Sequence, residues 1–193
     1  MIDEEKTMKH FDLSSIADEL TVAVVSDTHG RLDTRIAEVV AGSDAVIHAG
    51  DFCGAAVVHE LNRLSSNVIA VAGNNDIPAL WPESEAQVVS ALPKIAKVSV
   101  PGGEIIVEHG HRFGNKPDHA QLREAWPEAR LVVYGHTHIQ VWDRDDDPWV
   151  VNPGAAGYVR NQGGPSCTVL RLTRQAWDVE PIKFRETLDN RVA

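Results

Sequence analysis

The chain contains short runs of β-branched, almost entirely apolar residues that are separated by polar segments. The clearest runs are residues 22–25, 45–47, 68–72, 105–107 and 131–134. Runs that are apolar at every position are typical of strands buried on both faces of a sheet. Apolar residues at helical spacing lie between the first three runs: Ile36, Val39 and Val40, then Val57, Val58, Leu61 and Leu64. This alternation of strand and helix predicts crossovers onto a parallel sheet.

The second half of the chain indicates a different kind of sheet. Residues 94–100 and 104–108 flank a Pro-Gly-Gly link whose glycines can take the positive φ of a hairpin turn. A helix is predicted from Asp118, whose carboxylate can cap it, to Trp126, directly before Pro127. Further strands are predicted at residues 139–142, 149–151, 167–172 and 177–183. Together these elements predict an α/β protein with two sheets and helices outside them, the second sheet being partly antiparallel.

Residues 1–19 are interpreted as an N-terminal extension ahead of a single domain that covers residues 20–193. Apolar residues at helical spacing predict a short amphipathic helix there: Phe11, Leu13, Ile16 and Leu20. The first residues, MIDEEKTMKH, have neither the cationic start nor the apolar stretch of a secretory signal. No apolar run approaches the ~20 residues that a membrane-spanning helix needs. We therefore expect a cytoplasmic protein with no membrane partner.

The charge balance narrows the classes of partner. The 193 residues include 18 Lys and Arg against 28 Asp and Glu, which gives a formal net charge of −10. Wrapping of a nucleic-acid duplex requires clustered cations, so no duplex partner is expected. A chain of this length can bury roughly 70% of its unfolded surface, so a bound metal would serve function rather than hold the core together. Cys53 and Cys167 are expected to be free thiols.

Five of the predicted strands are each followed by a cluster of residues of the types that bind metals or phosphates. Each cluster also contains a glycine. The candidate ligands are Asp27, His29, Asp51, Asn74, His109, His136 and His138. Open α/β sheets bind ligands in the crevice beyond the carboxyl ends of their strands, so these clusters are expected to meet. In the Gly-His-Thr-His cluster, the two histidines are expected to leave an extended strand on the same side. The sequence therefore predicts a binding site at one edge of the fold.

Seven donors are more than one ion needs if it is to leave room for a substrate. They suit two ions that share a bridging carboxylate, so a dinuclear metal centre is predicted. Imidazole, carboxylate and amide oxygen without thiolate favour manganese, iron, nickel, cobalt or zinc over calcium. We expect two divalent ions, with manganese as the first candidate.

Several polar residues near these clusters have two interpretations each. Asp76 either orients a neighbouring side chain, a histidine ligand or Asn75, or caps a helix. His111 and Arg31 either contact a substrate phosphate or are, respectively, a packed loop residue and a solvated cation. His48, within the second predicted strand, is interpreted as a core residue.

Taken together, the clusters resemble the motifs of the calcineurin-like metallophosphoesterases, and most closely their compact microbial phosphodiesterase branch. The matching residues are Asp27-x-His29, Gly50-Asp51, Gly73-Asn74-x-Asp76, His109-Gly-His111 and Gly135-His136-Thr-His138. The resemblance implies a four-layer α/β/β/α sandwich of two mixed sheets flanked by helices. It also implies two ligand sets, with the first ion held by Asp27, His29 and His138. The second ion would be held by Asn74, His109 and His136, and Asp51 would bridge the two.

Asn75 is the main departure from the family pattern. Many members carry a histidine there, which is proposed to protonate the leaving group or to hold the phosphate. Asparagine cannot donate a proton at neutral pH. Hydrolysis of a substrate with a poor leaving group would therefore be slower by a factor on the order of 10² to 10⁴. Asn75, Asp76 and His111 are the predicted catalytic residues, and the resemblance of the chain to small relatives without the histidine favours diester substrates.

The sequence predicts a phosphodiesterase that depends on two metal ions and acts on a small phosphodiester. No Ser-His-Asp or Cys-His set is evident, so a metal-bridging hydroxide is the expected nucleophile. The alternatives are a phosphomonoesterase, a nuclease on small single-stranded substrates, and a non-catalytic protein-interaction scaffold of the same fold. A homo-oligomer is a further candidate assembly, and its interface candidates are Trp81, Trp126, Trp142, Trp149 and Trp177.

Overall fold

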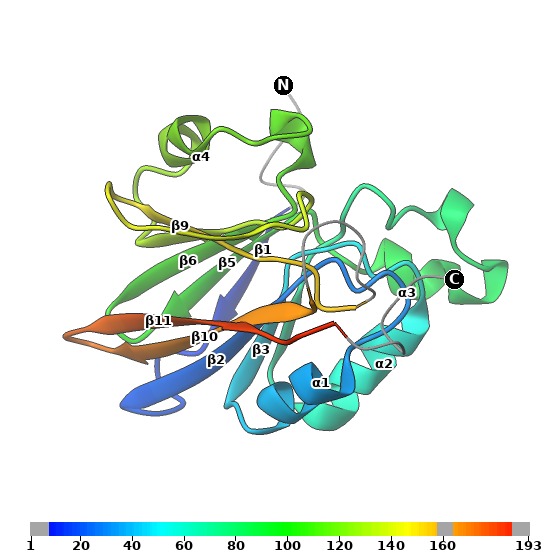
Figure 1. Ribbon diagram of the computed structural model, residues 1–193, viewed down its shortest axis with the longest axis horizontal. Helices are drawn as coiled ribbons and strands as arrows, with labels where there is room; N and C mark the ends of the chain where they lie inside the picture. Colours follow the sequence, from blue (N-terminus) through cyan, green and yellow to red (C-terminus); the bar gives the residue numbers. More distant parts are fainter. Residues whose placement is uncertain (1–7, 158–163, 187–193) are drawn as a thin grey trace.

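The structure is a computed structural model that describes residues 8–157 and 164–186. Within these residues the strands form two sheets that face each other (Figure 1). One sheet consists of β2 (Glu19–Val25), β3 (Ala45–His48), β4 (Val68–Ala70), β10 (Ser166–Thr173) and β11 (Trp177–Lys183), in the order β11-β10-β2-β3-β4. The other consists of β1 (Met8–Asp12), β5 (Ile95–Val100), β6 (Gly103–Glu108), β7 (Leu131–Val133), β8 (Gln140–Asp143) and β9 (Trp149–Pro153), in the order β1-β5-β6-β7-β9-β8.

The alternation of strand and helix in the first half folds as predicted. β2 pairs in parallel with β3, and β3 pairs in parallel with β4. The connections contain α1 (Thr34–Ala41) and α2 (Ala55–Leu64), whose buried apolar residues join a cluster with the sheet: Ile36, Val40, Val57 and Leu61. Because the three strands are parallel, their carboxyl ends lie at one edge of the sheet.

The second half forms the predicted hairpin and the predicted capped helix. β5 and β6 pair in antiparallel register, after which β6, β7 and β9 run parallel. α4 (His119–Ala125) begins after Asp118, whose side chain accepts the Ala120 N–H at 3.0 Å, and it ends before Pro127. The remaining helical segments are short: α3 (Ala86–Ser90), η2 (Pro78–Leu80), η3 (Glu83–Glu85) and η4 (His111–Phe113).

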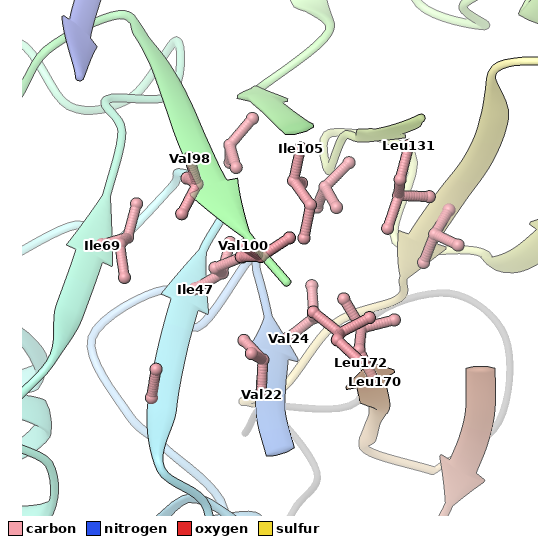
Figure 2. Close-up of a cluster of buried hydrophobic side chains, with 14 of the residues drawn as sticks. Val22, Val24, Ile47, Ile69, Val98, Val100, Ile105, Leu131, Leu170 and Leu172 are labelled. Carbon is pink, nitrogen blue, oxygen red and sulfur yellow. The ribbon is translucent and has the colours of Figure 1, made fainter. Parts of the chain in front are cut away.

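Three apolar clusters hold the layers together. The largest lies between the two sheets, where side chains from β2, β3 and β10 meet side chains from β5, β6 and β7 (Figure 2). A second cluster joins the five-stranded sheet to α1 and α2. A third, formed by Leu122, Val132, Tyr134 and Val150, joins α4 to the outer face of the six-stranded sheet. These contacts give four layers, with α4 on one side and α1 and α2 on the other, so the α/β/β/α sandwich is confirmed (Figure 1).

The N-terminal segment is a strand and not the predicted amphipathic helix. β1 pairs in parallel with β5 along its whole length. Phe11 packs against the cluster between the sheets, and Leu13 is buried while its N–H donates to Ser99 C=O at 2.8 Å. Ile16, which the helix would have turned inward, is exposed. Phe11 and Leu13 also fit the two-residue period of a strand, and the open edge of β5 selects that period.

The five tryptophans differ in burial. Trp81 and Trp177 are buried, whereas Trp126, Trp142 and Trp149 are half-buried and pack at the margins of apolar clusters. The homo-oligomer, and the use of these residues in its interface, stay predictions. In the described part of the chain, no helix has the length and apolar character needed to cross a membrane.

Candidate metal centre

Five loops carry the candidate ligands, and the fold brings all five together. The loops after β2, β3 and β4 come from one sheet, and those after β6 and β7 come from the other. Backbone hydrogen bonds join the loops: the Asp27 N–H donates to Gly50 C=O at 2.9 Å, and the Gly135 N–H donates to His109 C=O at 3.2 Å. The His136 N–H donates to the Asp27 carboxylate at 3.0 Å and so connects the two sheets at the site.

Asp27, His29, Asp51 and His138 form a cluster suited to a metal ion. Each offers one ligand atom, and these atoms all lie within 4.8 Å of one another. The Nε2 atoms of His29 and His138 face each other at 3.1 Å, and His138 Nε2 lies 3.3 Å from Asp27 Oδ1. Asp27 and Asp51 are almost fully buried. Buried carboxylates beside converging imidazole nitrogens form the kind of donor set that binds divalent cations.

The other three candidates lie on the opposite side of Asp51. His109 Nε2 is 3.2 Å from Asn74 Oδ1 and 3.5 Å from Asp51 Oδ1. The rings of His109 and His136 are 5.3 Å apart. Asp51 Oδ2 lies 3.9 Å from His29 Nε2, so the two oxygens of this carboxylate face the two groups. All seven candidate ligands are therefore brought together, and Asp51 stands between them.

Five of these residues have a left-handed backbone. The φ angles are 52° at Asp27, 45° at His29, 63° at Asp51, 69° at His136 and 58° at His138. L-residues rarely adopt this conformation, and each instance costs about 1–2 kcal/mol. The expected extended strand through His136 and His138 is wrong, because β7 already ends at Val133. The two imidazoles are aimed by loop conformation and not by strand alternation.

Two glycines permit the close approach of the loops. A Cβ on Gly73 would overlap Asp51 Oδ1 and the Asp51 backbone nitrogen. A Cβ on Gly50, whose φ is +95°, would lie 2.6 Å from His109 Nδ1. The ligand-bearing loops therefore pack through positions where only glycine fits.

Asp76 anchors the loop that carries Asp51. Its Oδ2 accepts the N–H groups of Asp51 at 2.7 Å, Phe52 at 3.1 Å and Gly73 at 2.9 Å, and its Oδ1 accepts that of Cys53 at 3.0 Å. The sequence suggested other partners for Asp76. Within the described residues its side chain makes no hydrogen bond to a histidine, to Asn75 or to a helix terminus, so both of those interpretations are wrong. A buried carboxylate that accepts four backbone N–H groups fixes the loop around a predicted ligand.

Asn75 holds the Asp51 side chain itself. Its N–H donates to Asp51 Oδ1 at 2.9 Å, and its Nδ2 donates to Asp51 Oδ2 at 2.6 Å. Burial raises the pKa of Asp51, but the hydrogen bond and charge of His109 and the hydrogen bonds of Asn75 outweigh it and hold that pKa well below its ordinary value. Burial lowers the pKa of His109, and Asp51 and Asp27 more than reverse that shift. Asp51 is therefore an anion at neutral pH, as a bridging ligand must be.

A model of the calcineurin-like phosphoesterase superfamily domain matches residues 20–175, which include all five loops. The chain belongs to this superfamily. This match confirms the resemblance that the motifs indicated. The cluster of Asp27, His29, Asp51 and His138 gives this phosphoesterase a site suited to a divalent metal ion.

Individual relatives agree with the family assignment. This phosphoesterase is 29% identical over 179 residues to phosphodiesterase MJ0936 of Methanocaldococcus jannaschii, which covers 86% of this chain and 98% of that protein. It is 29% identical over 166 residues to phosphodiesterase YfcE of Escherichia coli K12, with 73% and 81% covered. The structure of vacuolar protein sorting 29 from Cryptosporidium parvum shares the fold at a TM-score of 0.69 and 21% identity, covering 88% of this chain and 100% of that one.

The remaining predicted site residues lie beside the cluster. The ring of His111 is 5.5 Å from that of His109 and 6.3 Å from that of His136, and its side chain is exposed. Partial desolvation beside the cluster, and then the charges of His109 and His136, lower the pKa of His111. Arg31 follows Gly30 in the loop after β2 and is half-buried. A contact of either residue with a substrate phosphate stays a prediction.

His48 supports the site from the core, a role that the sequence did not indicate. It is fully buried, as predicted. Its Nδ1 accepts the Gly50 N–H at 3.1 Å, so Nε2 carries the proton and donates to Thr28 Oγ1 at 3.0 Å. The ring also stacks on Phe52, with centroids 3.5 Å apart. His48 thereby ties the loop after β2 to the loop after β3, and the only sequence signal was a polar residue in an apolar strand.

The stability of this phosphoesterase is expected to fall in mild acid because of His48. Burial, and then the charge of His109, lower the pKa of His48 from its ordinary value of 6.5 to about 3. Above pH 6.5 both the folded and the unfolded imidazole are neutral, so the stabilisation is complete there. Below it the unfolded chain takes up the proton first, which costs the folded state roughly 2 kcal/mol by about pH 5. Urea unfolding of the metal-free protein between about pH 7.5 and pH 5 measures this loss.

A substitution isolates the contribution of His48 from that of other groups. His48→Gln has no titrating group at this position, so the difference in unfolding free energy between wild type and variant should shrink by roughly 2 kcal/mol from about pH 7.5 to pH 5. His59→Gln makes the same substitution at an exposed position on α2 and serves as its control. A constant difference between wild type and His48→Gln would refute the assignment.

Proposed function

We propose that this phosphoesterase is a phosphodiesterase that uses two divalent metal ions, manganese first among them, to cleave a small phosphodiester. The observation that carries the proposal is the position of Asp51. Its Oδ1 lies 3.5 Å from His109 Nε2 and its Oδ2 lies 3.9 Å from His29 Nε2, so one buried carboxylate faces two donor groups. The relatives named phosphodiesterases, MJ0936 and YfcE, support the choice of substrate class.

The chemistry of the donor groups and their positions around Asp51 support two ions. Asp27, His29 and His138 would hold one ion, and Asn74, His109 and His136 would hold the other, with Asp51 shared between them. Imidazole nitrogen, carboxylate and amide oxygen suit manganese, iron, nickel, cobalt and zinc. When bound, such ions polarise the phosphoryl group and lower the pKa of water to near neutrality.

Asn75 supports the choice of a diester with a good leaving group. Its side-chain nitrogen donates to Asp51 at 2.6 Å, so it steadies the shared carboxylate. It has no proton to give to a departing oxygen at neutral pH. His111, exposed beside His136, is the residue that we propose contacts the substrate phosphate. A substrate whose leaving group departs without protonation therefore suits this site best.

Turnover of nitrophenyl esters tests the proposal directly. With Mn²⁺ present, a bis-nitrophenyl diester should be cleaved faster than nitrophenyl phosphate, and a chelator should abolish both reactions. Exchange of one nitrophenyl group for an alkyl group, with cleavage of the alkyl bond measured, should lower the rate by about 10²-fold or more, because no general acid assists that leaving group.

Each alternative function has its own outcome in these assays. Faster turnover of the monoester would indicate a phosphomonoesterase, and faster cleavage of a short single strand than of the diester would indicate a nuclease. No hydrolysis with any of the five metals would favour the scaffold, which the fold shared with vacuolar protein sorting 29 keeps as a candidate. Within the described residues neither Cys53 nor Cys167 forms a disulfide. A cytoplasmic location stays a prediction.

A further inference from the structure

The chain crosses from the six-stranded to the five-stranded sheet directly after β9 (Figure 1). Residues 152–157, which are the last two residues of β9 and the four that follow it, lie against ligand-bearing loops from both sheets. Asn152 begins the segment and is fully buried, with a neutral side chain. A buried amide needs hydrogen-bond partners, and those of Asn152 are all in or beside the site.

The Asn152 amide holds the loop that carries His136 and His138. Its Nδ2 donates to Gly135 C=O at 2.6 Å and to Thr137 Oγ1 at 3.1 Å, so it contacts the residues on both sides of His136. Thr137 Oγ1 in turn accepts the Ile139 N–H at 3.3 Å, across His138. Asn152 Oδ1 accepts the Gly154 N–H at 2.9 Å, which fixes the orientation of the amide.

The far end of the segment holds the loop that carries Asp27. Gly154 C=O accepts the Ser26 hydroxyl at 2.9 Å, and the Ala156 N–H donates to Ser26 C=O at 2.9 Å. A Cβ on Gly157 would overlap Thr28 C=O, so the two backbones are in direct contact. Residues 152–157 therefore contact one ligand-bearing loop at each end.

We propose that residues 152–157 act as a clasp that sets the distance between these two loops, with Asn152 as the positioning residue for His136 and His138. The inference rests on the proposed metal function. Both histidines have a left-handed backbone, with φ angles of 69° and 58°. Such conformations persist only where the surroundings enforce them, and the Asn152 amide supplies that restraint on both sides of His136.

Metal binding by Asn152→Ala tests the positioning role. The variant should bind Mn²⁺ about 10- to 100-fold more weakly than the wild type, which is the usual effect of removing a residue that orients metal ligands. Isothermal titration of the full chain with Mn²⁺ measures this affinity without any substrate. The Mn²⁺-dependent rise in melting temperature should shrink in parallel.

Gln140→Ala is the matched control. Gln140 is also an amide on the six-stranded sheet, and it donates to the backbone carbonyls of Cys167 at 2.8 Å and Ile182 at 3.2 Å, neither of which belongs to a ligand-bearing loop. Its backbone pairs with Pro153, and the substitution leaves that pairing in place because it removes only the end of the side chain. It should lose stability in the metal-free state and keep the wild-type affinity for Mn²⁺. Equal losses of affinity in the two variants would show a general structural role and overturn the proposal, as would an unchanged affinity in Asn152→Ala.

A milder pair of variants covers the case in which Asn152→Ala does not fold. Thr137→Val removes the hydroxyl that accepts from Asn152 and Ile139 at nearly the same volume, and Thr137→Ser keeps it. The valine variant should bind Mn²⁺ several-fold more weakly and the serine variant should bind as the wild type does. Equal affinities in the pair would overturn the clasp, whereas a wild type that binds no Mn²⁺ would instead overturn the proposed function.

Discussion

Asp51→Asn is expected to lower kcat/KM for the proposed metal-dependent hydrolysis of a diester by roughly 10³-fold or more, because the two ions that we propose share Asp51 would supply several kcal/mol of transition-state stabilisation. Asp51 is the one side chain that faces both donor groups, through Oδ1 toward His109 and Oδ2 toward His29. The amide preserves the size of the side chain but brings no charge and only one oxygen. Initial rates on a bis-nitrophenyl diester across Mn²⁺ concentrations measure the loss, and His136→Ala should likewise lose the metal-stimulated rate.

Asp44→Asn is the control for this experiment. Asp44 lies just before β3, at the opposite end of the strand from Asp51, and accepts the Thr21 N–H at 2.8 Å. Asp44→Asn also removes one carboxylate charge beside β3, but Asp44 does not contact the site. The kcat/KM of this variant should therefore remain near the wild-type value. Wild-type turnover in both Asp51→Asn and His136→Ala would defeat the metal-centre interpretation.

Asp76→Ala is expected to lower the free energy of unfolding by about 4 kcal/mol. The substitution leaves four backbone N–H groups in and beside the Asp51 loop without their acceptor, each at roughly 1 kcal/mol or more when buried. Urea unfolding of the metal-free protein gives the difference directly. The variant should also bind Mn²⁺ more weakly than the wild type, because the backbone of Asp51 loses the contact that positions it.

Asp118→Ala provides the scale for this loss. Asp118 also accepts a backbone N–H, that of Ala120 at the start of α4, but it is exposed and accepts only this one. Loss of such a cap costs about 1 kcal/mol. If Asp76→Ala cost no more than Asp118→Ala, the anchoring role of Asp76 would be wrong, and water would have to satisfy the freed N–H groups.

Most of the strands could be predicted because a run that is apolar at every position indicates a strand buried on both faces. The runs that form β2, β3, β6 and β7 belong to the two sheets, which are the inner layers of the sandwich, and most of their side chains are buried. β1 could not be predicted in this way. Its residues are only partly buried, so their pattern is weak, and pairing with the edge of β5 decides its conformation.

The grouping of the candidate ligands could be predicted, and the contacts of the residues that hold their loops could not. Asp and His residues after apolar strands signal a metal site because the strand ends converge by topology. His48, Asn152 and Asp76 act through backbone atoms of other loops, and a sequence does not show which backbone N–H or C=O a side chain will meet. The hydrogen-bond partners predicted for Asp76 are therefore wrong, and the sequence does not reveal that His48 holds two loops together.

The residue types and their spacing are enough to predict the succession of strands along the chain and the position of seven candidate metal ligands at strand ends. Those features are local, since they depend on hydrophobic period and on the chemistry of single side chains. Three features become visible only in the folded chain: Asp51 stands between two donor groups, five candidate ligands have left-handed backbones, and residues 152–157 contact loops of both sheets. These features depend on contacts between segments far apart in the chain, which exist only once the two sheets have packed.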